Sequence, residues 1–176
     1  MSLGESTYTL ELPYRRSVGP VVGAFLTGLR DATVVGSRTA AGRVIVPPLE
    51  YDPDTGDAVD DLVPVGSAGV VRTWAWVPEP MRKHPLDRPF AWALVQLDGA
   101  DSALLHALDV PSAEDVQTGM RVQIRWSDER TGHINDIACF EVEPTGETSG
   151  QHRAVGSGTA GPVTAARGLP EPETGS

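Results

Sequence analysis

The residues that could carry chemistry in this 176-residue chain are few, and their spacing joins none of them into a recognisable catalytic or metal-binding set. The four histidines, His84, His106, His133 and His152, include no pair at the i, i+4 spacing that places two metal ligands on one helix face. The single cysteine, Cys139, lies in an apolar run, which favours a small buried thiol over a nucleophile. His106 also lies in an apolar run, where a hydrogen-bonded histidine is commoner than a catalytic base. We therefore predict neither a catalytic residue nor a bound metal.

An aspartate-rich segment, Tyr51–Asp57 followed by Asp60 and Asp61, resembles a calcium loop because alternating carboxylates before a glycine can surround one cation. The position at which an EF-hand loop supplies its bidentate glutamate holds Val63 instead. The flanking residues are typical of strands and turns rather than helices. The sequence therefore favours a solvated turn over a calcium site.

Two other segments are candidates for binding. Trp74 and Trp76 alternate in an apolar stretch, so both rings lie on one face of a predicted strand, as a stacking platform or as part of the core. The segment Met81–Pro89 gathers three permanent positive charges and a histidine. It can meet a small multiply charged phosphate ligand or an acidic patch on a partner, or it is simply a solvated loop. The candidate ligand- or partner-binding residues are Trp74, Trp76, Arg82, Lys83, His84 and Arg88.

The overall charge narrows the choice of partners. Fourteen basic against 24 acidic side chains give a net charge of −10, which repels phosphate polymers and anionic lipid headgroups. One cysteine permits no internal disulfide, and no apolar run approaches the roughly 18 residues that a membrane-spanning helix needs. The first residues lack the basic and apolar parts of a signal peptide. We expect a cytoplasmic protein that binds neither nucleic acid nor membrane.

The elements that must position these residues begin with one amphipathic helix. Apolar residues from Val18 to Leu29 follow the spacing of a single helix stripe, with Ser17 as the N-cap and Pro20 in the first turn. The pattern predicts a helix from about Ser17 to Arg30. Its apolar stripe covers either the protein's own core or a partner.

After the helix the periodicity falls to two, which predicts a mainly β domain. The last five apolar runs favour a five-stranded, partly open barrel, with a small sandwich as the alternative. From Pro144 onward, Gly, Pro, Ser and Thr dominate, so we expect a disordered tail. The predicted strands are 34–37, 43–46, 70–77, 90–97, 104–108, 121–126 and 134–142.

Six stretches of the chain carry a further pattern: Leu12–Gly19, Gly42–Pro48, His84–Phe90, Leu97–Asp101 with His106, Gly119–Val122 and Asp136–Phe140. Together they resemble the zinc-ribbon plus OB-fold family catalogued as domain of unknown function family 35. The resemblance implies an α+β, mainly β protein with an N-terminal helical segment (1–33), a rubredoxin-like ribbon (34–66), a C-terminal five-stranded OB barrel (67–143) and a tail (144–176). It covers roughly residues 12–142 in the expected order.

The chain departs from that family at the zinc ligands. Where the ribbon would carry two Cys-x-x-Cys-Gly knuckles, the glycines remain and the cysteines are replaced by Arg38, Ala41, Asp52 and Thr55. These side chains cannot supply a tetrahedral zinc site, so the resemblance implies a metal-free ribbon held by packing and hydrogen bonds. We expect an ion pair between Arg38 and Asp52 to replace part of the metal crosslink.

The resemblance also implies a function. Members of the family are associated with acyl-CoA metabolism, and several are non-catalytic partners of thiolase-like enzymes, including steroid side-chain aldolases, or are fused to acyl-CoA hydratases. We therefore expect an accessory subunit in a hetero-oligomer with a thiolase-fold enzyme or a hydratase, with acyl-CoA as a candidate ligand and no zinc. Two alternatives remain: a hydratase or thioesterase that uses Asp98, Asp101 and His106, and a single-strand nucleic-acid binder that uses Trp74, Trp76 and the basic loop.

Overall fold

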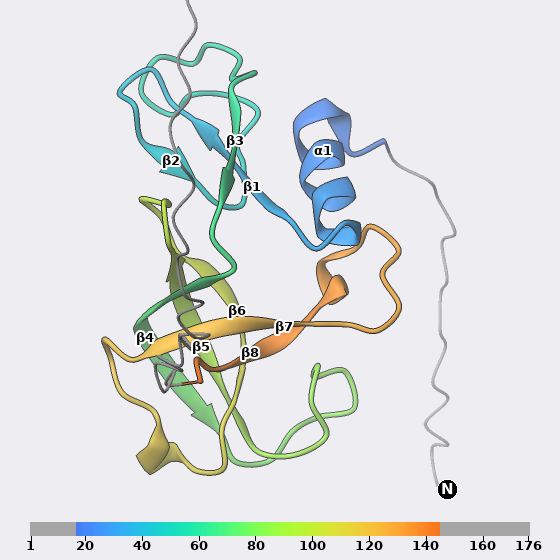
Figure 1. Cartoon of the computed structure of the whole chain (residues 1–176), viewed down its shortest axis with the longest axis vertical. Coiled ribbons are helices and arrows are strands. Elements are labelled where there is room, and N and C mark those ends of the chain that lie inside the picture. Colours follow the sequence, from blue (N-terminus) through green and yellow to red (C-terminus); the bar gives the residue numbers. More distant parts are fainter. Residues whose placement is uncertain (1–16, 145–176) are drawn as a thin grey trace, which may run out of the picture. The chain divides into compact units, whose positions relative to one another are not determined.

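The predicted fold class is confirmed by a computed structural model that describes residues 17–144 (Figure 1). The residues before Ser17 and the predicted tail beyond Pro144 lie outside the described residues. The elements are α1 (Gly19–Arg30), β1 (Val34–Arg38), β2 (Val44–Ile45), β3 (Leu62–Val65), β4 (Ala68–Val77), β5 (Phe90–Leu97), β6 (Leu104–Asp109), β7 (Arg121–Trp126), β8 (Ile137–Val142) and two 3-10 turns, η1 (Ala113–Asp115) and η2 (Ile134–Asp136).

The helix α1 forms on the predicted stripe, but its N-cap lies one residue later than expected. Val21, Phe25 and Leu29 are its buried residues, so the stripe covers the protein's own core. The N-cap is Val18 rather than Ser17, because Gly19 takes a left-handed backbone with φ at 79° directly before Pro20. No described helix is long and apolar enough to cross a membrane.

The ribbon region contains an antiparallel sheet in the order β2-β1-β3. β3 is an element that the periodicity does not predict, because Pro64 interrupts its apolar run. Proline removes a ladder donor and is tolerated at a sheet edge, which is where β3 lies. The sheet is tied to the next domain through Asp101 and Ser102: Val44 N donates to Asp101 Oδ2 at 2.8 Å, and Val46 N donates to Ser102 Oγ at 2.7 Å.

The remaining strands form a closed barrel in the order β4-β5-β6-β8-β7, with β7 pairing back to β4. The pairs are antiparallel except for β6 and β8, which run parallel with Leu108 opposite Phe140. A five-stranded barrel with this Greek-key order has the OB topology, so the predicted barrel is confirmed and the sandwich alternative is wrong. The predicted strand 134–142 is shorter than expected because its first residues form the turn η2.

The barrel interior mixes large and small side chains. Trp74 and Trp76 on β4 lie opposite Ala93 and Ala91 on β5, and both alanines are fully buried. A narrow barrel accommodates bulky residues of one strand only where the neighbouring strand is small. Successive side chains of β5 lie on alternate faces, so Trp92 lies on the opposite face from these alanines.

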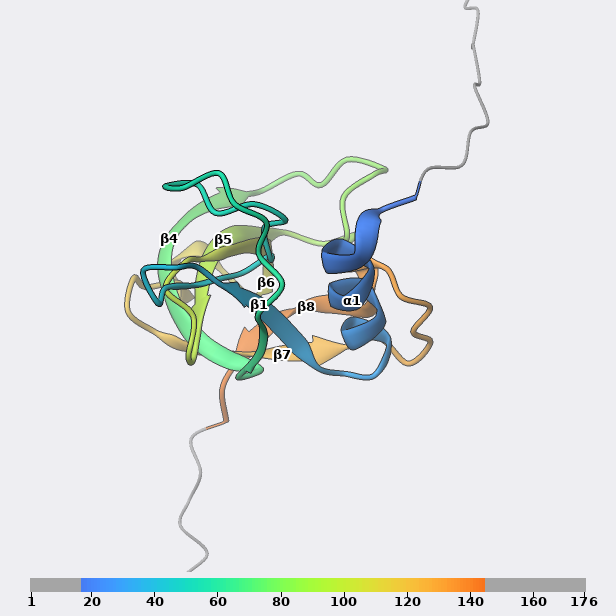
Figure 2. The same cartoon turned by 90° about the horizontal axis from the view of Figure 1, so that it is seen from above.

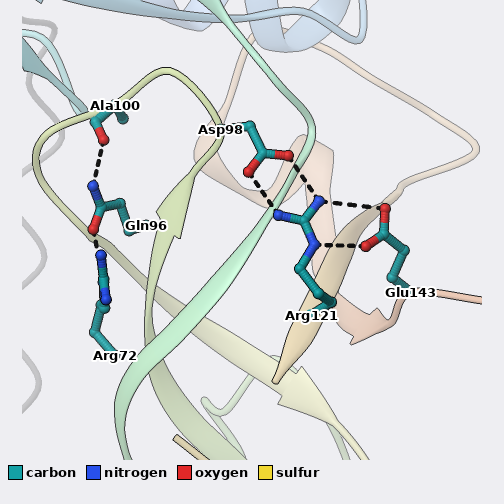
Figure 3. A network of polar contacts seen from close by, with 6 residues as sticks. All are labelled: Arg72, Gln96, Asp98, Ala100, Arg121 and Glu143. Carbon is teal, nitrogen blue, oxygen red and sulfur yellow. Dashed lines mark hydrogen bonds and ion pairs between the residues drawn. The ribbon is translucent and has the colours of Figure 1, made fainter. Parts of the chain in front are cut away.

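Arg121 fastens the seam at which the barrel closes (Figure 3). Its Nη1 and Nη2 donate to the two carboxylate oxygens of Asp98 at 2.6 and 2.8 Å, and its Nε donates to Glu143 Oε2 at 2.7 Å. The planar guanidinium thereby joins the β5–β6 turn to the residue that follows β8. Beside it, Arg72 Nε donates to Gln96 Oε1, and Gln96 Nε2 donates to the carbonyl of Ala100.

Candidate functional site

A cavity of about 660 Å³ lies against β5 and β6, between the β4–β5 loop and the β7–β8 loop. In an OB barrel, the second and third strands and these two loops form the face on which ligands usually bind. The volume is within the range of small-molecule sites. Six of the lining residues matter for its chemistry: Lys83, His84, Leu86, Trp92, Leu105 and His106.

The β4–β5 loop is held against the barrel by its histidine. The ring of His84 lies edge-on to Phe90 and Trp92, with centroids 5.5 and 6.1 Å away. Its Nδ1 accepts a hydrogen bond from Met81 N at 3.2 Å. The neutral ring therefore carries its proton on Nε2, which is a donor at the cavity wall.

The β7–β8 loop is organised by the buried carboxylate of Asp136. This group accepts hydrogen bonds from the backbone N–H groups of Thr131, Gly132 and His133 at 2.7–3.1 Å. Burial raises the pKa of Asp136, but the three N–H donors outweigh it and hold the pKa below its usual range. Arg130 Nε donates to the carbonyl of Arg30, so the loop is tied to the end of α1, which lies beside it in Figure 2.

His106 is a buried residue of the cavity wall. It is 7% exposed, and its Nδ1 has no hydrogen-bond partner among residues 17–144. Burial lowers the pKa of His106, so the imidazole is neutral near pH 7. The expectation of a barrel histidine is met in its burial but not in a hydrogen bond at Nδ1.

The three cations of the basic loop do not act together. Arg88 Nε donates to Asp109 Oδ1 at 3.1 Å, and its Nη2 also contacts that carboxylate, which Arg125 binds as well. Arg88 therefore fixes the end of the loop to β6. Arg82 and Lys83 make neither a hydrogen bond nor an ion pair within residues 17–144. They follow Met81, which is 69% exposed, and these three residues are termed the basic tip.

The two tryptophans singled out in the sequence lie elsewhere. Trp74 and Trp76 are partly buried and pack against the main core, as in the core alternative, and neither lines the cavity. Trp92 is the tryptophan of the cavity, and the sequence analysis does not select it. The available signal is its alternation with Ala91 and Ala93, which places it on the other face of β5.

The catalytic alternative finds no support in the positions of its residues. Asp98 is held by Arg121, and Asp101 accepts from the backbone of Val44. Neither lines the cavity that contains His106. The described structure therefore does not bring these three side chains together.

The knuckles of the ribbon are joined by hydrogen bonds to Asp52, and the expected ion pair of Asp52 with Arg38 is wrong. Oδ2 of Asp52 accepts from Ala40 N at 2.7 Å, and Oδ1 accepts from Asp54 N at 2.8 Å and from Thr55 N at 3.3 Å. Because the backbone occupies both oxygens, Arg38 pairs with Asp61 instead, at 3.2 Å. Within residues 17–144, no group of three or more histidine, cysteine, aspartate or glutamate side chains is placed to hold a metal ion.

A helix, a small ribbon-like sheet and a closed barrel of OB topology define the class of protein, and comparisons with known proteins name its relatives. Residues 62–127 match the family model of the ChsH2 C-terminal OB-fold domain. The fold is similar to that of a DUF35-family protein from Sulfolobus solfataricus (TM-score 0.54, 20% identity, 72% of this chain and 85% of that chain). It is also similar to a chain of the Ltp2-ChsH2(DUF35) aldolase (TM-score 0.55, 20% identity, 73% of this chain and 98% of that chain).

These matches confirm the resemblance stated from the sequence: residues 62–127 match the ChsH2 C-terminal OB-fold model, and the fold is similar to that of DUF35-family structures. The search of curated proteins finds no match. The boundaries 1–33, 34–66, 67–143 and 144–176 remain predictions.

Proposed function

We propose that this protein is a non-catalytic accessory subunit that binds a thiolase-fold enzyme, such as a thiolase or aldolase of lipid or steroid degradation, or an acyl-CoA hydratase. The observation that carries the proposal is the likeness to a chain of the Ltp2-ChsH2(DUF35) aldolase over 98% of that chain. The catalytic residues would then belong to the partner, in keeping with the separation of Asp98, Asp101 and His106. Acyl-CoA is the proposed ligand of the assembly.

The basic tip is the proposed docking element. Arg82 and Lys83 are exposed cations without partners among the described residues, and Met81 adds apolar surface beside them. Unpaired charges of this kind steer association with an acidic surface and mainly change the association rate. Arg88 is excluded from this role because Asp109 holds it.

The test begins with capture of the tagged full-length chain from its own organism at native expression levels, and the complex is then reconstituted from purified subunits. We expect a thiolase-fold enzyme or hydratase, with turnover of acyl-CoA esters by the complex and none by the isolated chain. Arg82→Glu with Lys83→Glu should lower the association rate constant about tenfold. Arg72→Glu, a single charge reversal on β4, is the control for charge reversal elsewhere on the barrel and should change it little. Turnover by the isolated chain, or a captured partner of another class, contradicts the proposal.

A further inference from the structure

We propose that the cavity between the β4–β5 and β7–β8 loops binds a small amphipathic monocarboxylate, an apolar body with one anionic head. This site belongs to the chain by itself and does not depend on the accessory role. The proposed occupant of this site is a small molecule, not a partner protein.

The charges at the cavity select an anion. Lys83 contributes an ammonium without a partner in the described part of the chain, and His84 contributes the Nε2 donor. No carboxylate lines this cavity, although the chain has 24 acidic residues. A second cavity on the ribbon, in contrast, is lined by four aspartates: Asp52, Asp57, Asp60 and Asp61.

The number of positive charges in the cavity lining favours a ligand with a single anionic group. Lys83 is the one permanent cation in the lining, because Arg88 is paired outside it and the ring of His106 is neutral. A polyphosphate or an oligonucleotide needs a row of cations along its backbone. One ammonium with one N–H donor suits one carboxylate.

The remaining walls suit an apolar body. Leu86, Trp92, Leu105 and Ile134 line the cavity, and Leu105 leaves 57% of its surface exposed there. Covering Leu105 and the part of Trp92 that lines the cavity removes apolar surface from water, which favours binding. An aliphatic chain or a flat ring system fills such walls, and its carboxylate reaches Lys83 at the edge.

The experiment is calorimetric titration of the isolated full-length chain with decanoate, decanol and decylammonium, which share one apolar body and differ in head charge. We expect decanoate to bind most tightly and decylammonium least. Lys83→Gln should weaken decanoate about threefold to fivefold, as expected for a solvent-exposed pair. The same change should leave decanol unaffected.

A second variant tests the location of the site. Leu105→Asp puts a carboxylate on the exposed wall and should weaken decanoate at least tenfold with little change in melting temperature. Val142→Asp is the matched control, because Val142 is also exposed on the barrel but does not line the cavity. The proposal is overturned if decanoate gives no binding heat, if decanol binds equally well, or if Leu105→Asp behaves like Val142→Asp. None of these results bears on capture of an enzyme partner, so the two proposals fail separately.

Discussion

Asp52 replaces one cysteine of a zinc knuckle and takes over the task of joining the two knuckle loops. One carboxylate oxygen reaches the first knuckle at Ala40, and the other holds the second knuckle at Asp54 and Thr55. These backbone donors, led by Ala40, lower the pKa of Asp52 from its ordinary value. The ionised carboxylate is therefore the form that the folded ribbon requires.

Stability should depend on the protonation of Asp52. A carboxylate whose folded pKa lies below its unfolded value of about 3.9 contributes stability above that value and loses it as the pH falls through the folded pKa. We expect Asp52→Asn to be less stable at pH 7, because its amide N–H₂ faces backbone donors, and to lose part of the stability change between pH 5 and pH 2. Urea unfolding across this range measures both effects. Asp60→Asn, at an exposed aspartate of the same loop, is the control, and equal pH profiles for Asp52→Asn and the natural chain would contradict the prediction.

At the scale of elements, the seam between β4 and β7 depends on few backbone pairs. Ala68, Gly69 and Val70 are the residues of β4 that pair with β7. On its other side, β4 lies very close to β5: a side chain added at Gly69 would lie 2.3 Å from the carbonyl oxygen of Gln96, so glycine is required there. The guanidinium of Arg121 therefore adds a side-chain fastening at this seam, between Asp98 and Glu143.

Removal of that fastening should destabilise the barrel modestly. Because the ion pairs of Arg121 are partly exposed, we expect Arg121→Ala to lose only a small part of the unfolding free energy, with a smaller loss at high salt. Arg121→Lys keeps the charge but not the planar fork, so it should recover less than half of the loss. Urea unfolding at low and high salt measures both, with Arg72→Ala as the control. A lysine variant as stable as the natural chain would show that the fork geometry is unimportant.

The elements are largely predictable from sequence. Which face of a strand points into the barrel is not. β5 follows its predicted range, yet both alternating sets of its residues are apolar, Phe90 with Trp92 and Ala91 with Ala93. Only the neighbouring tryptophans of β4 decide that the alanines lie inward. The cavity is harder to predict for the same reason, since its walls come from segments that only barrel pairing brings together.

The basic loop shows the same limit at the level of single residues. Its positive charge is evident in the sequence, but the sequence alone does not distinguish the roles of its three cations. Asp109 lies 21 residues after Arg88, and the pairing of β5 with β6 is what brings Asp109 to it. That long-range contact separates Arg88, which is structural, from Arg82 and Lys83.

At the scale of the whole molecule, the ribbon should fold without zinc. Arg38, Ala41, Asp52 and Thr55 offer no thiolate at the four knuckle positions, and both oxygens of Asp52 are already bound by backbone donors. We expect elemental analysis of the purified protein to find far less than one zinc per chain. A chelator should leave the melting temperature unchanged. One zinc per chain, or a lower melting temperature in the chelator, would show that other ligands hold a metal.

The strand order of the barrel also determines when its strands can pair during synthesis of the chain. Among the strands of residues 17–144, β8 is the last to be made, yet it lies between β6 and β7. Until Ile137–Val142 has been translated, both neighbours present an unpaired edge, and such edges template pairing with other chains. A ribosome that stalls before residue 137 therefore leaves a nascent chain with two open edges, and a premature stop codon there would yield a fragment prone to aggregate rather than a smaller stable domain.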